Sequence, residues 1–278
     1  MARTRVLITV ATYPLPSRRY DELVCTAGIL ENGQWIRIYP VPLSFLTGLR
    51  KDGKIESFKY NWIELDLEKR ANSNDFRPES HSPTYYDFRD IILHGKVGTE
   101  NNWAERKRLC TSNVYTNMKM LLSHSRDPQN TSLATFKPTE ILDFYIKEEE
   151  NREWKDEWKE LRKQGDLFEQ DRDPEIVIPK LPYKFYYRFR DDEGTESRLM
   201  IEDWEIGALY WNCLRSTEGN EPEALKLVRD KYERSFLNEK DIYLFLGTTN
   251  EWHRRRAKNP FVIIGVFYPK KSQQDTLF

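Results

Sequence analysis

The sequence is poor in cysteine and has no long apolar run. Its three cysteines, Cys25, Cys110 and Cys213, are an odd number and lie far apart, which fits neither a disulfide framework nor the spacing of zinc ligands. The apolar run from Val6 to Val10 is far shorter than the roughly 20 residues that a membrane span needs. We therefore expect a protein of the reducing cytoplasm that is neither exported nor inserted into a membrane.

The chain also lacks an excess of charge and a phosphate-binding loop. Its 44 basic and 45 acidic residues nearly cancel, so net charge alone would hold neither DNA nor an acidic membrane. Gly28, Gly33, Gly95 and Gly98 never form a phosphate loop followed by Lys-Ser or Lys-Thr. The sequence thus disfavours nucleotide hydrolysis, no cofactor is expected, and any nucleic-acid site must be a local patch.

The first half of the chain is patterned as strands, with β-branched and apolar residues between turn residues. Asn32-Gly33 supplies the positive φ of a tight hairpin. We therefore predict a β-rich N-terminal domain over residues 1–147. The expected strands are 5–12, 22–30, 34–40, 62–69 and 139–147, and the expected helix is 103–123.

Two further regions and a tail follow. Residues 148–181 are dense in charge, and apolar residues repeat at helical spacing from Trp154, which predicts a charged helical connector. Residues 182–271 combine apolar strands with two amphipathic helices, the second capped by Asn220. The predicted fold class is therefore α+β, with a β-rich N-terminal domain, this connector, a smaller α/β C-terminal domain and a flexible tail over 272–278.

Two pentapeptides of the form Q-x-x-L-F stand in the connector and at the end of the sequence. They resemble the peptide by which bacterial polymerases, mismatch-repair proteins and some mobile-element proteins dock on the sliding clamp. The resemblance implies that the glutamine enters a polar pocket and the Leu-Phe pair an apolar one, so the bacterial sliding clamp is an expected partner. Chance, or packing of Leu-Phe after the preceding helix, is the alternative. The residues concerned are Gln164, Leu167 and Phe168, and Gln274, Leu277 and Phe278.

Longer blocks of the chain resemble an uncharacterised family of bacterial proteins. The resemblance implies a bacterial or phage source and no particular chemistry. The blocks are Tyr20–Gly28, Trp35–Pro40, Asp75–Ser80, Asn102–Lys107 and Asp203–Glu205.

Two strands alternate aromatic and basic residues on the face opposite their apolar one. Rings can stack on bases while cations meet phosphates, a combination that single-stranded binders place on a sheet. A basic loop at 252–258 adds cations that a solvated turn does not need. These patterns predict DNA, possibly single-stranded, as a partner; a helix covering the faces and a merely solubilising loop are the alternatives. The candidate residues are Trp35, Arg37, Tyr39, Lys184, Tyr186, Arg188, Arg190, Arg254, Arg255 and Arg256.

Acidic clusters are the candidate catalytic groups. Glu64, Asp66 and Glu68 share a strand face at a spacing suited to a divalent ion, although a solvated strand face has the same pattern. A second set of acidic residues could form the active site of a nuclease. The alternative is that Asp203 of this set caps a helix. That second set is Glu202, Asp203, Glu205, Asp75 and Glu79.

Together these observations favour a DNA-associated adaptor or accessory protein of bacterial replication, repair or defence, recruited by the sliding clamp. Two alternatives stay open. One is a clamp-recruited nuclease. A divalent metal would be its cofactor, and no cofactor is expected under the other interpretations. The other is a plain protein-interaction module whose aromatic residues all belong to the core.

Overall fold

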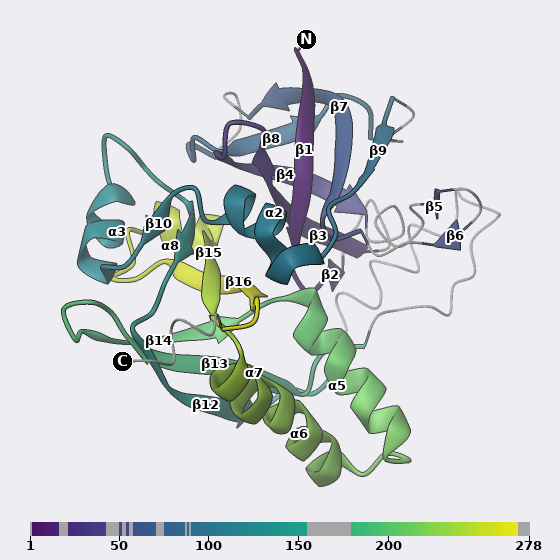
Figure 1. The fold of residues 1–278 in the computed structure, drawn as a ribbon, viewed down its shortest axis with the longest axis vertical. Coiled ribbons are helices and arrows are strands. Elements are labelled where there is room, and N and C mark those ends of the chain that lie inside the picture. Colours follow the sequence, from purple (N-terminus) through teal and green to yellow (C-terminus); the bar gives the residue numbers. More distant parts are fainter. Residues whose placement is uncertain are drawn as a thin grey trace.

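The computed structural model describes residues 2–16, 22–42, 50–51, 54–55, 58–70, 75–86, 88, 90–154 and 179–271. In this part of the chain two large sheets pack against each other, and a group of helices covers the far side of the second sheet (Figure 1). The expectation of a mixed fold with a β-rich first half is confirmed. Most of the predicted connector lies outside the described residues.

The first sheet closes into a small barrel. Strands β1 (Ala2–Ala11), β3 (Glu22–Leu30) and β4 (Trp35–Pro42) pair antiparallel in that order. Strand β8 (Ser80–Pro83) lies parallel to β4, and β7 (Asn61–Lys69) pairs with both β8 and β1. Because β7 returns to β1, these five strands form a ring, in which the main-chain groups of both edges find partners.

The barrel interior follows from the two-residue period of its strands. Ile63, Leu65 and Leu67 of β7 point inward and are buried, as the alternation predicts. The predicted hairpin is also present, and Gly33 adopts a φ of 80° in its turn. The remaining strands are β2 (Leu15–Pro16) beside β3, β9 (Ile92–Lys96) beside β7, and the separate pair β5 (Arg50–Lys51) and β6 (Lys54–Ile55).

The second sheet has the strand order β10-β11-β15-β16-β14-β13-β12. It therefore includes strands between Val114 and Lys147, a stretch that the sequence assigns to an N-terminal domain ending at 147. That boundary is wrong because these strands pair with partners distant in sequence, which local periodicity cannot reveal. The strands are β10 (Val114–Tyr115), β11 (Leu133–Phe136), β12 (Glu140–Glu148), β13 (Tyr183–Arg190), β14 (Glu196–Ile201), β15 (Tyr243–Thr248) and β16 (Phe261–Phe267).

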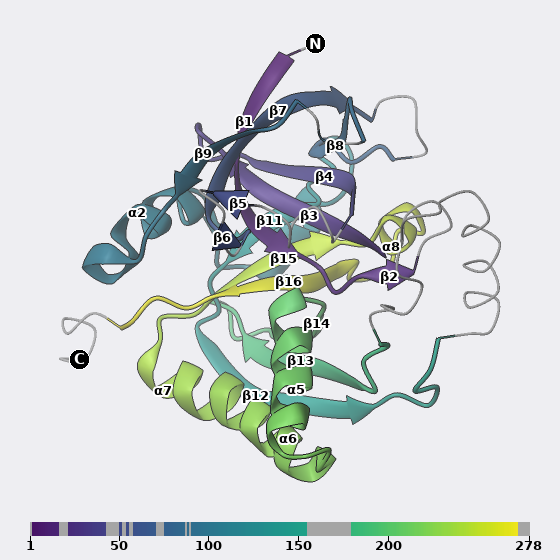
Figure 2. The same cartoon turned by 90° about the vertical axis from the view of Figure 1, so that its right-hand side faces the viewer.

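Helices cover the face of the second sheet that points away from the barrel, as Figure 2 shows. Asn220 caps one of them by accepting a hydrogen bond from the backbone of Glu223, as predicted. These helices are α5 (Trp204–Ser216), α6 (Glu221–Arg229), the π-helical turn η2 (Asp230–Ser235) and α7 (Phe236–Glu239).

The single helix expected over 103–123 is instead two helices, α2 (Glu100–Cys110) and α3 (Met118–His124), separated by β10. One more short helix, α8 (Asn250–Arg254), precedes β16. Among the residues that the structure describes, none of the helices has the length and hydrophobicity that a membrane crossing requires.

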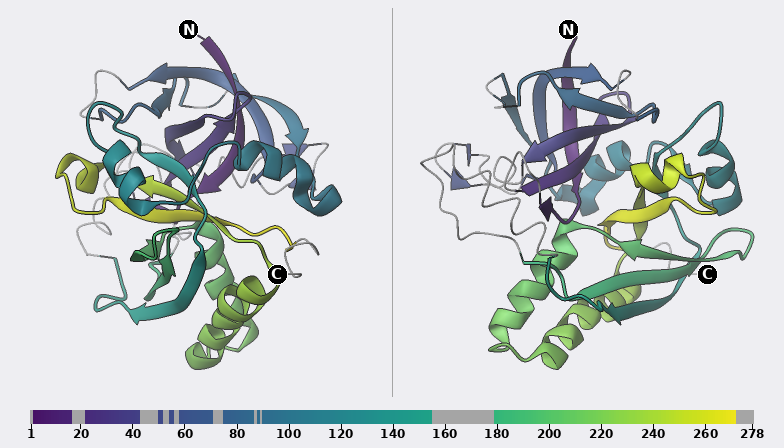
Figure 3. Two further views of the ribbon diagram at one scale, coloured as in Figure 1. Left: turned by 60° about the vertical axis from the view of Figure 1, so that its left-hand side comes forward. Right: turned by 180° about the vertical axis from the view of Figure 1, so that it is seen from behind.

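The barrel and the second sheet share an apolar core. Leu7 and Ile29 of the barrel pack with Phe245 and Ile264 of the second sheet, and all four are buried. Trp35 meets the ring of Phe245 edge-on, with 5.1 Å between the ring centroids. The two views of Figure 3 show β11, β15 and β16 beneath the barrel, while β12, β13 and β14 continue past it. One face of the second sheet is thus covered by the barrel in one half only.

A buried ion pair joins the loop before β7 to the start of α5. The Nζ atom of Lys59 lies 3.2 Å from a carboxylate oxygen of Asp203 and 2.9 Å from one of Glu205, and Asp203 is fully buried. Although burial opposes it, these two carboxylates raise the pKa of Lys59 above its ordinary value, so the lysine stays charged. Asp203 also accepts a hydrogen bond from the backbone of Glu205, which confirms that it caps α5.

Replacing Asp203 by alanine should therefore cost more than the loss of a helix cap. We expect about 3–5 kcal/mol of unfolding free energy, because Lys59 would be left as a buried charge without its main partner. Asn220→Ala is the matched control, since it removes a cap that holds no buried cation and should cost about 1 kcal/mol. Urea unfolding of both variants measures the difference, and equal losses would show that the ion pair contributes nothing.

Candidate nucleic-acid interface and inter-domain cleft

The aromatic and basic face predicted on β4 is not a solvent-exposed surface. Arg37 is 2% exposed and donates two hydrogen bonds to Ser132 on the second sheet, from Nη1 to the hydroxyl at 2.7 Å and from Nη2 to the carbonyl at 3.1 Å. Trp35 is half-buried against Phe245, and only Tyr39 keeps an exposed ring. The prediction that Arg37 contacts phosphates is wrong, because the barrel packs with this face against the second sheet.

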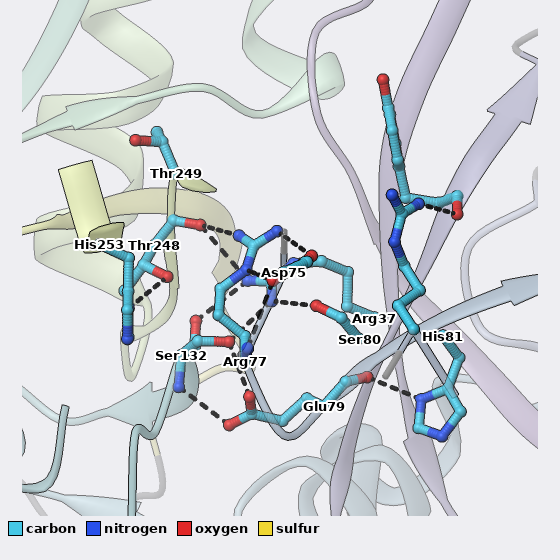
Figure 4. A network of polar contacts seen from close by, with 12 residues as sticks. Arg37, Asp75, Arg77, Glu79, Ser80, His81, Ser132, Thr248, Thr249 and His253 are labelled. Carbon is cyan, nitrogen blue, oxygen red and sulfur yellow. Dashed lines mark hydrogen bonds and ion pairs between the residues drawn. The ribbon is translucent and has the colours of Figure 1, made fainter. Parts of the chain in front are cut away.

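Arg77 joins Arg37 in a buried polar network between the two domains (Figure 4). Its guanidinium forms a fork with Asp75, in which Nε and Nη2 each lie 2.7 Å from a carboxylate oxygen, and its Nη1 donates to the carbonyl of Thr248 at 2.8 Å. Burial alone would raise the pKa of Asp75, but the hydrogen bonds and charge of Arg77 outweigh it and lower the pKa to about 2. Asp75 is therefore a permanent counter-ion for Arg77.

Glu79 completes the same network rather than a catalytic site. Its carboxylate accepts from the backbone N–H of Ser132 at 2.9 Å and from the hydroxyl of Ser132 at 2.7 Å. Asp203 and Glu205 are held by Lys59, as described above. Four of the five acids considered for a nuclease thus have structural partners, and within the described residues no group of three or more metal-ligating side chains comes together. The structure gives the nuclease interpretation no assembled site.

The acidic face of β7 also has structural partners, at Glu64. Glu64 accepts from Nε of Arg3 at 2.8 Å, and its second oxygen lies 2.7 Å from Nε2 of His94. The hydrogen bond with His94, and to a smaller extent the one with Arg3, lowers the pKa of Glu64. Asp66 is half-buried and Glu68 is exposed on the same strand. This face therefore matches the solvated strand face that was the alternative to a metal site.

The outer face of β12–β14 is the half of the second sheet that the barrel leaves uncovered. On β13, Phe185, Tyr187 and Phe189 are buried toward the helices, so the predicted alternation is present. The residues that share the outer face across the three strands are Glu140, Asp143, Tyr145 and Lys147 of β12, Lys184, Tyr186, Arg188 and Arg190 of β13, and Glu196, Arg198 and Met200 of β14.

Two tyrosines and an arginine form the centre of this face. The rings of Tyr145 and Tyr186 are neighbours across the strands, with centroids 5.9 Å apart, and Tyr145 is 41% exposed. The guanidinium of Arg198 lies over both rings, 5.7 Å from one centroid and 5.9 Å from the other. Sequence reasoning missed Tyr145 and Arg198, although the alternation of 139–147 could have placed Tyr145 opposite the buried Phe144.

Acidic neighbours balance most of the cations on this face. Lys184 lies 2.6 Å from Glu149, and Arg188 lies 3.3 Å from Glu196. Arg190 contacts both Glu140 at 3.1 Å and Glu196 at 2.9 Å. The face therefore offers rings and exchangeable ion pairs rather than a strong positive field.

The basic loop after β15 is only partly free. Arg255 pairs with Glu251 at 3.0 Å, and Arg256 pairs with Asp127 at 2.6 Å while its guanidinium covers Phe76. Arg254 is exposed and has no ion-pair partner among the described residues. Fewer free cations than predicted remain in this loop, because Arg255 pairs with an acid of its own helix and Arg256 pairs with an acid of a neighbouring segment.

A cleft between the two domains opens beside the buried network. Its volume is about 550 Å³. The barrel contributes Cys25 and Tyr39, the second sheet contributes Met200 and Ile264, and Glu202 directly follows β14. The guanidinium-bearing residues Arg37, Arg70 and Arg77 also line the cleft. Glu202 is half-buried, and burial raises its pKa, opposed in part by the charge of Lys184. Sequence reasoning named Glu202 but could not place it in a cavity, since the cleft exists only between packed domains.

The structure does not describe the two Q-x-x-L-F pentapeptides. Both copies lie outside the described residues, and so do the other residues of the connector between 155 and 178. The residues concerned are Gln164, Leu167, Phe168, Gln274, Leu277 and Phe278.

His253 lies next to the buried network and has a strongly shifted pKa. The side chain is 1% exposed, and its Nδ1 atom lies 3.0 Å from the hydroxyl of Thr248. Burial, reinforced by the positive charges of Arg77 and Arg256, lowers the pKa of His253 from 6.5 to about 4. The folded protein therefore holds this imidazole neutral at pH values where an unfolded chain would protonate it.

This shift predicts a loss of stability in acid. The neutral His253 contributes its full share of the free energy of unfolding above pH 6.5. This share disappears as the pH falls toward 4, because between these pH values only the unfolded chain takes up the proton. The full effect is about 3 kcal/mol. Unfolding free energies measured from pH 7 to 4 should fall less steeply for His253→Gln than for the unchanged protein, and equal slopes would contradict the assignment.

Comparison with known proteins identifies domains rather than an activity. No curated protein matches the chain. The solved structure of a murine DNA binding protein bound with double-stranded DNA aligns over 98% of this chain and 98% of that chain at 11% identity, with a TM-score of 0.29, too low to establish a common fold. Residues 2–112 match a domain of unknown function, DUF8758, and residues 113–278 match another, DUF8757, so the division falls between α2 and β10, where the two sheets separate. The chain belongs to the family defined by the domain of unknown function DUF8757.

Proposed function

We propose that this protein binds single-stranded nucleic acid, DNA in the first instance, on the outer face of β12–β14. The observation that carries the proposal is the group formed by the exposed Tyr145 and Arg198 and the half-buried Tyr186 at the centre of that face. Aromatic rings and guanidinium planes stack on unpaired bases whatever their sequence, and each stacked base contributes about 1–3 kcal/mol. A duplex, whose bases are already stacked, gains much less from such a surface.

The charges around the tyrosines support the same function. An exposed ion pair contributes only about 0–1 kcal/mol, so a phosphate can replace Glu196 or Glu140 beside Arg188 and Arg190 at little cost. The acids also reduce the general attraction for polyanions. Binding should therefore depend on salt, but with the modest slope of a few phosphate contacts.

Removal of both tyrosine rings tests this proposal. Tyr145→Ala combined with Tyr186→Ala should weaken binding to a single-stranded oligonucleotide at least tenfold, because two stacking platforms are lost. Fluorescence anisotropy at several salt concentrations measures this effect. Arg234→Ala, an exposed arginine on the helical side of the second sheet, is the control that should leave binding unchanged.

Two results would contradict the proposal. One is the absence of any binding by the unchanged protein at low salt. The other is equal binding by the tyrosine variant and the Arg234 variant, which would move the interaction to another surface.

We also propose that the bacterial sliding clamp recruits the protein to DNA. Support comes from the sequence alone, through the two Q-x-x-L-F pentapeptides, and the pocket-filling Leu-Phe pair could supply roughly 3–5 kcal/mol before ordering costs. A DNA-binding adaptor of replication, repair or defence would gain a second point of attachment in this way. Such tethering raises local concentration without new contacts to DNA.

The copy at Gln274–Phe278 should account for most of the clamp affinity. Leu277→Ala together with Phe278→Ala should abolish micromolar binding to purified clamp in calorimetry, since both apolar anchors are removed. Leu167→Ala with Phe168→Ala, the matching change in the other copy, should have the smaller effect. Absence of heat with the unchanged protein at high micromolar concentration would end this part of the proposal.

A further inference from the structure

The cleft between the domains is continuous with the proposed nucleic-acid face. Lys184 and Met200 belong to the outer face of β12–β14 and also line the cleft. The volume of about 550 Å³ lies within the range of roughly 300–1,000 Å³ that small-molecule sites occupy. A strand lying over Tyr145 and Tyr186 would therefore pass the mouth of a cavity large enough for one of its bases.

Two residues at the cleft carry hydrogen-bond acceptors without partners, beside one unpartnered donor, the buried Nε of Arg37. Among the described residues the Glu202 carboxylate has no hydrogen-bond partner. Asn250 also lines the cleft, and its amide oxygen is buried without a partner. Leaving such groups unpaired costs free energy, which a ligand with matching donors would recover. The complementary ligand therefore presents several N–H donors on one edge.

The walls of the cleft are suited to a flat ring. Met200, Ile264 and Cys25 provide apolar or polarisable surface, and Tyr39 adds an aromatic ring that is 38% exposed. Of the guanidinium groups that also line the cleft, Arg77 is paired with Asp75, and Arg37 donates its hydrogen bonds to Ser132 and Thr248. Lys184 lies where the cleft meets the outer face. A base can therefore lie against the apolar walls while its phosphate meets Lys184.

We propose that the cleft receives one guanine base, turned out of the strand that the outer face of β12–β14 holds. Guanine carries adjacent N1–H and N2–H₂ donors, which match the two oxygens of the Glu202 carboxylate. The inference rests on the proposed binding of single-stranded nucleic acid and specifies which base that site selects. Extrusion from a single strand costs little because no base pair has to be broken.

The thiol of Cys25 provides a direct readout of occupancy. Cys25 is half-buried at the cleft, whereas Cys110 and Cys213 are 1% and 8% exposed and should react slowly with a disulfide reagent such as Ellman's. Saturating guanosine monophosphate, or an oligothymidine with one central guanosine, should slow the reaction of Cys25 at least tenfold. Oligothymidine alone should bind, as measured by anisotropy, without this protection. Cys25→Ser identifies the fast phase.

Two variants test the assignment of residues. Glu202→Gln should remove the protection by guanosine monophosphate while binding of oligothymidine persists, and Met200→Trp should fill the cleft with the same result. Glu223→Gln, an exposed acid on α6, is the control that should behave as the unchanged protein. Protection that is equal for adenosine and guanosine monophosphates, or that survives Glu202→Gln, would overturn the inference. If no oligonucleotide binds at all, the proposed function fails instead, and protection by guanosine monophosphate still decides whether the cleft takes the base.

Discussion

Two buried guanidinium groups hold the barrel against the second sheet, and the rest of the architecture depends on them. Arg37 and Arg77 both come from the N-terminal domain and donate to the other domain: Arg37 to Ser132 and Thr248, and Arg77 to the carbonyl of Thr248. A buried charge is tolerated only where nearly all of its donors find acceptors, which fixes the relative position of the domains more tightly than apolar packing alone. The cleft, which lies beside this network, keeps its shape for the same reason.

The division of the second sheet into a covered and an uncovered half follows from that arrangement. The barrel is smaller than the seven-stranded sheet, so it covers β11, β15 and β16 and leaves β12–β14 open. The same sheet face is apolar where it is covered, at Phe245 and Ile264, and it is polar, with the exposed Tyr145 and the half-buried Tyr186, where it is not. The change of chemistry along one continuous face marks the position of the proposed binding surface.

Much of the local structure could be predicted from the sequence, because alternation and capping are local signals. The β3–β4 hairpin, the inward face of β7 and the Asn220 cap are examples. The environment of Arg37 could not be predicted, since a two-residue period says which side a residue faces but not what covers that side. Arg198 was missed because its place beside Tyr145 depends on the register of three strands. The cleft is a property of domain packing and has no sequence pattern of its own.

Strand β12 is the last strand of the second sheet in the described part of the chain, and this position has a consequence for self-association. An outermost strand presents unpaired main-chain groups that can recruit a strand from another molecule. Glu140, Asp143, Lys147 and Glu148 place charges of both signs along the nine residues of β12. These charges make edge-to-edge addition of a second copy unfavourable. The charges of β12 therefore oppose strand addition at the open edge that lies beside Tyr145.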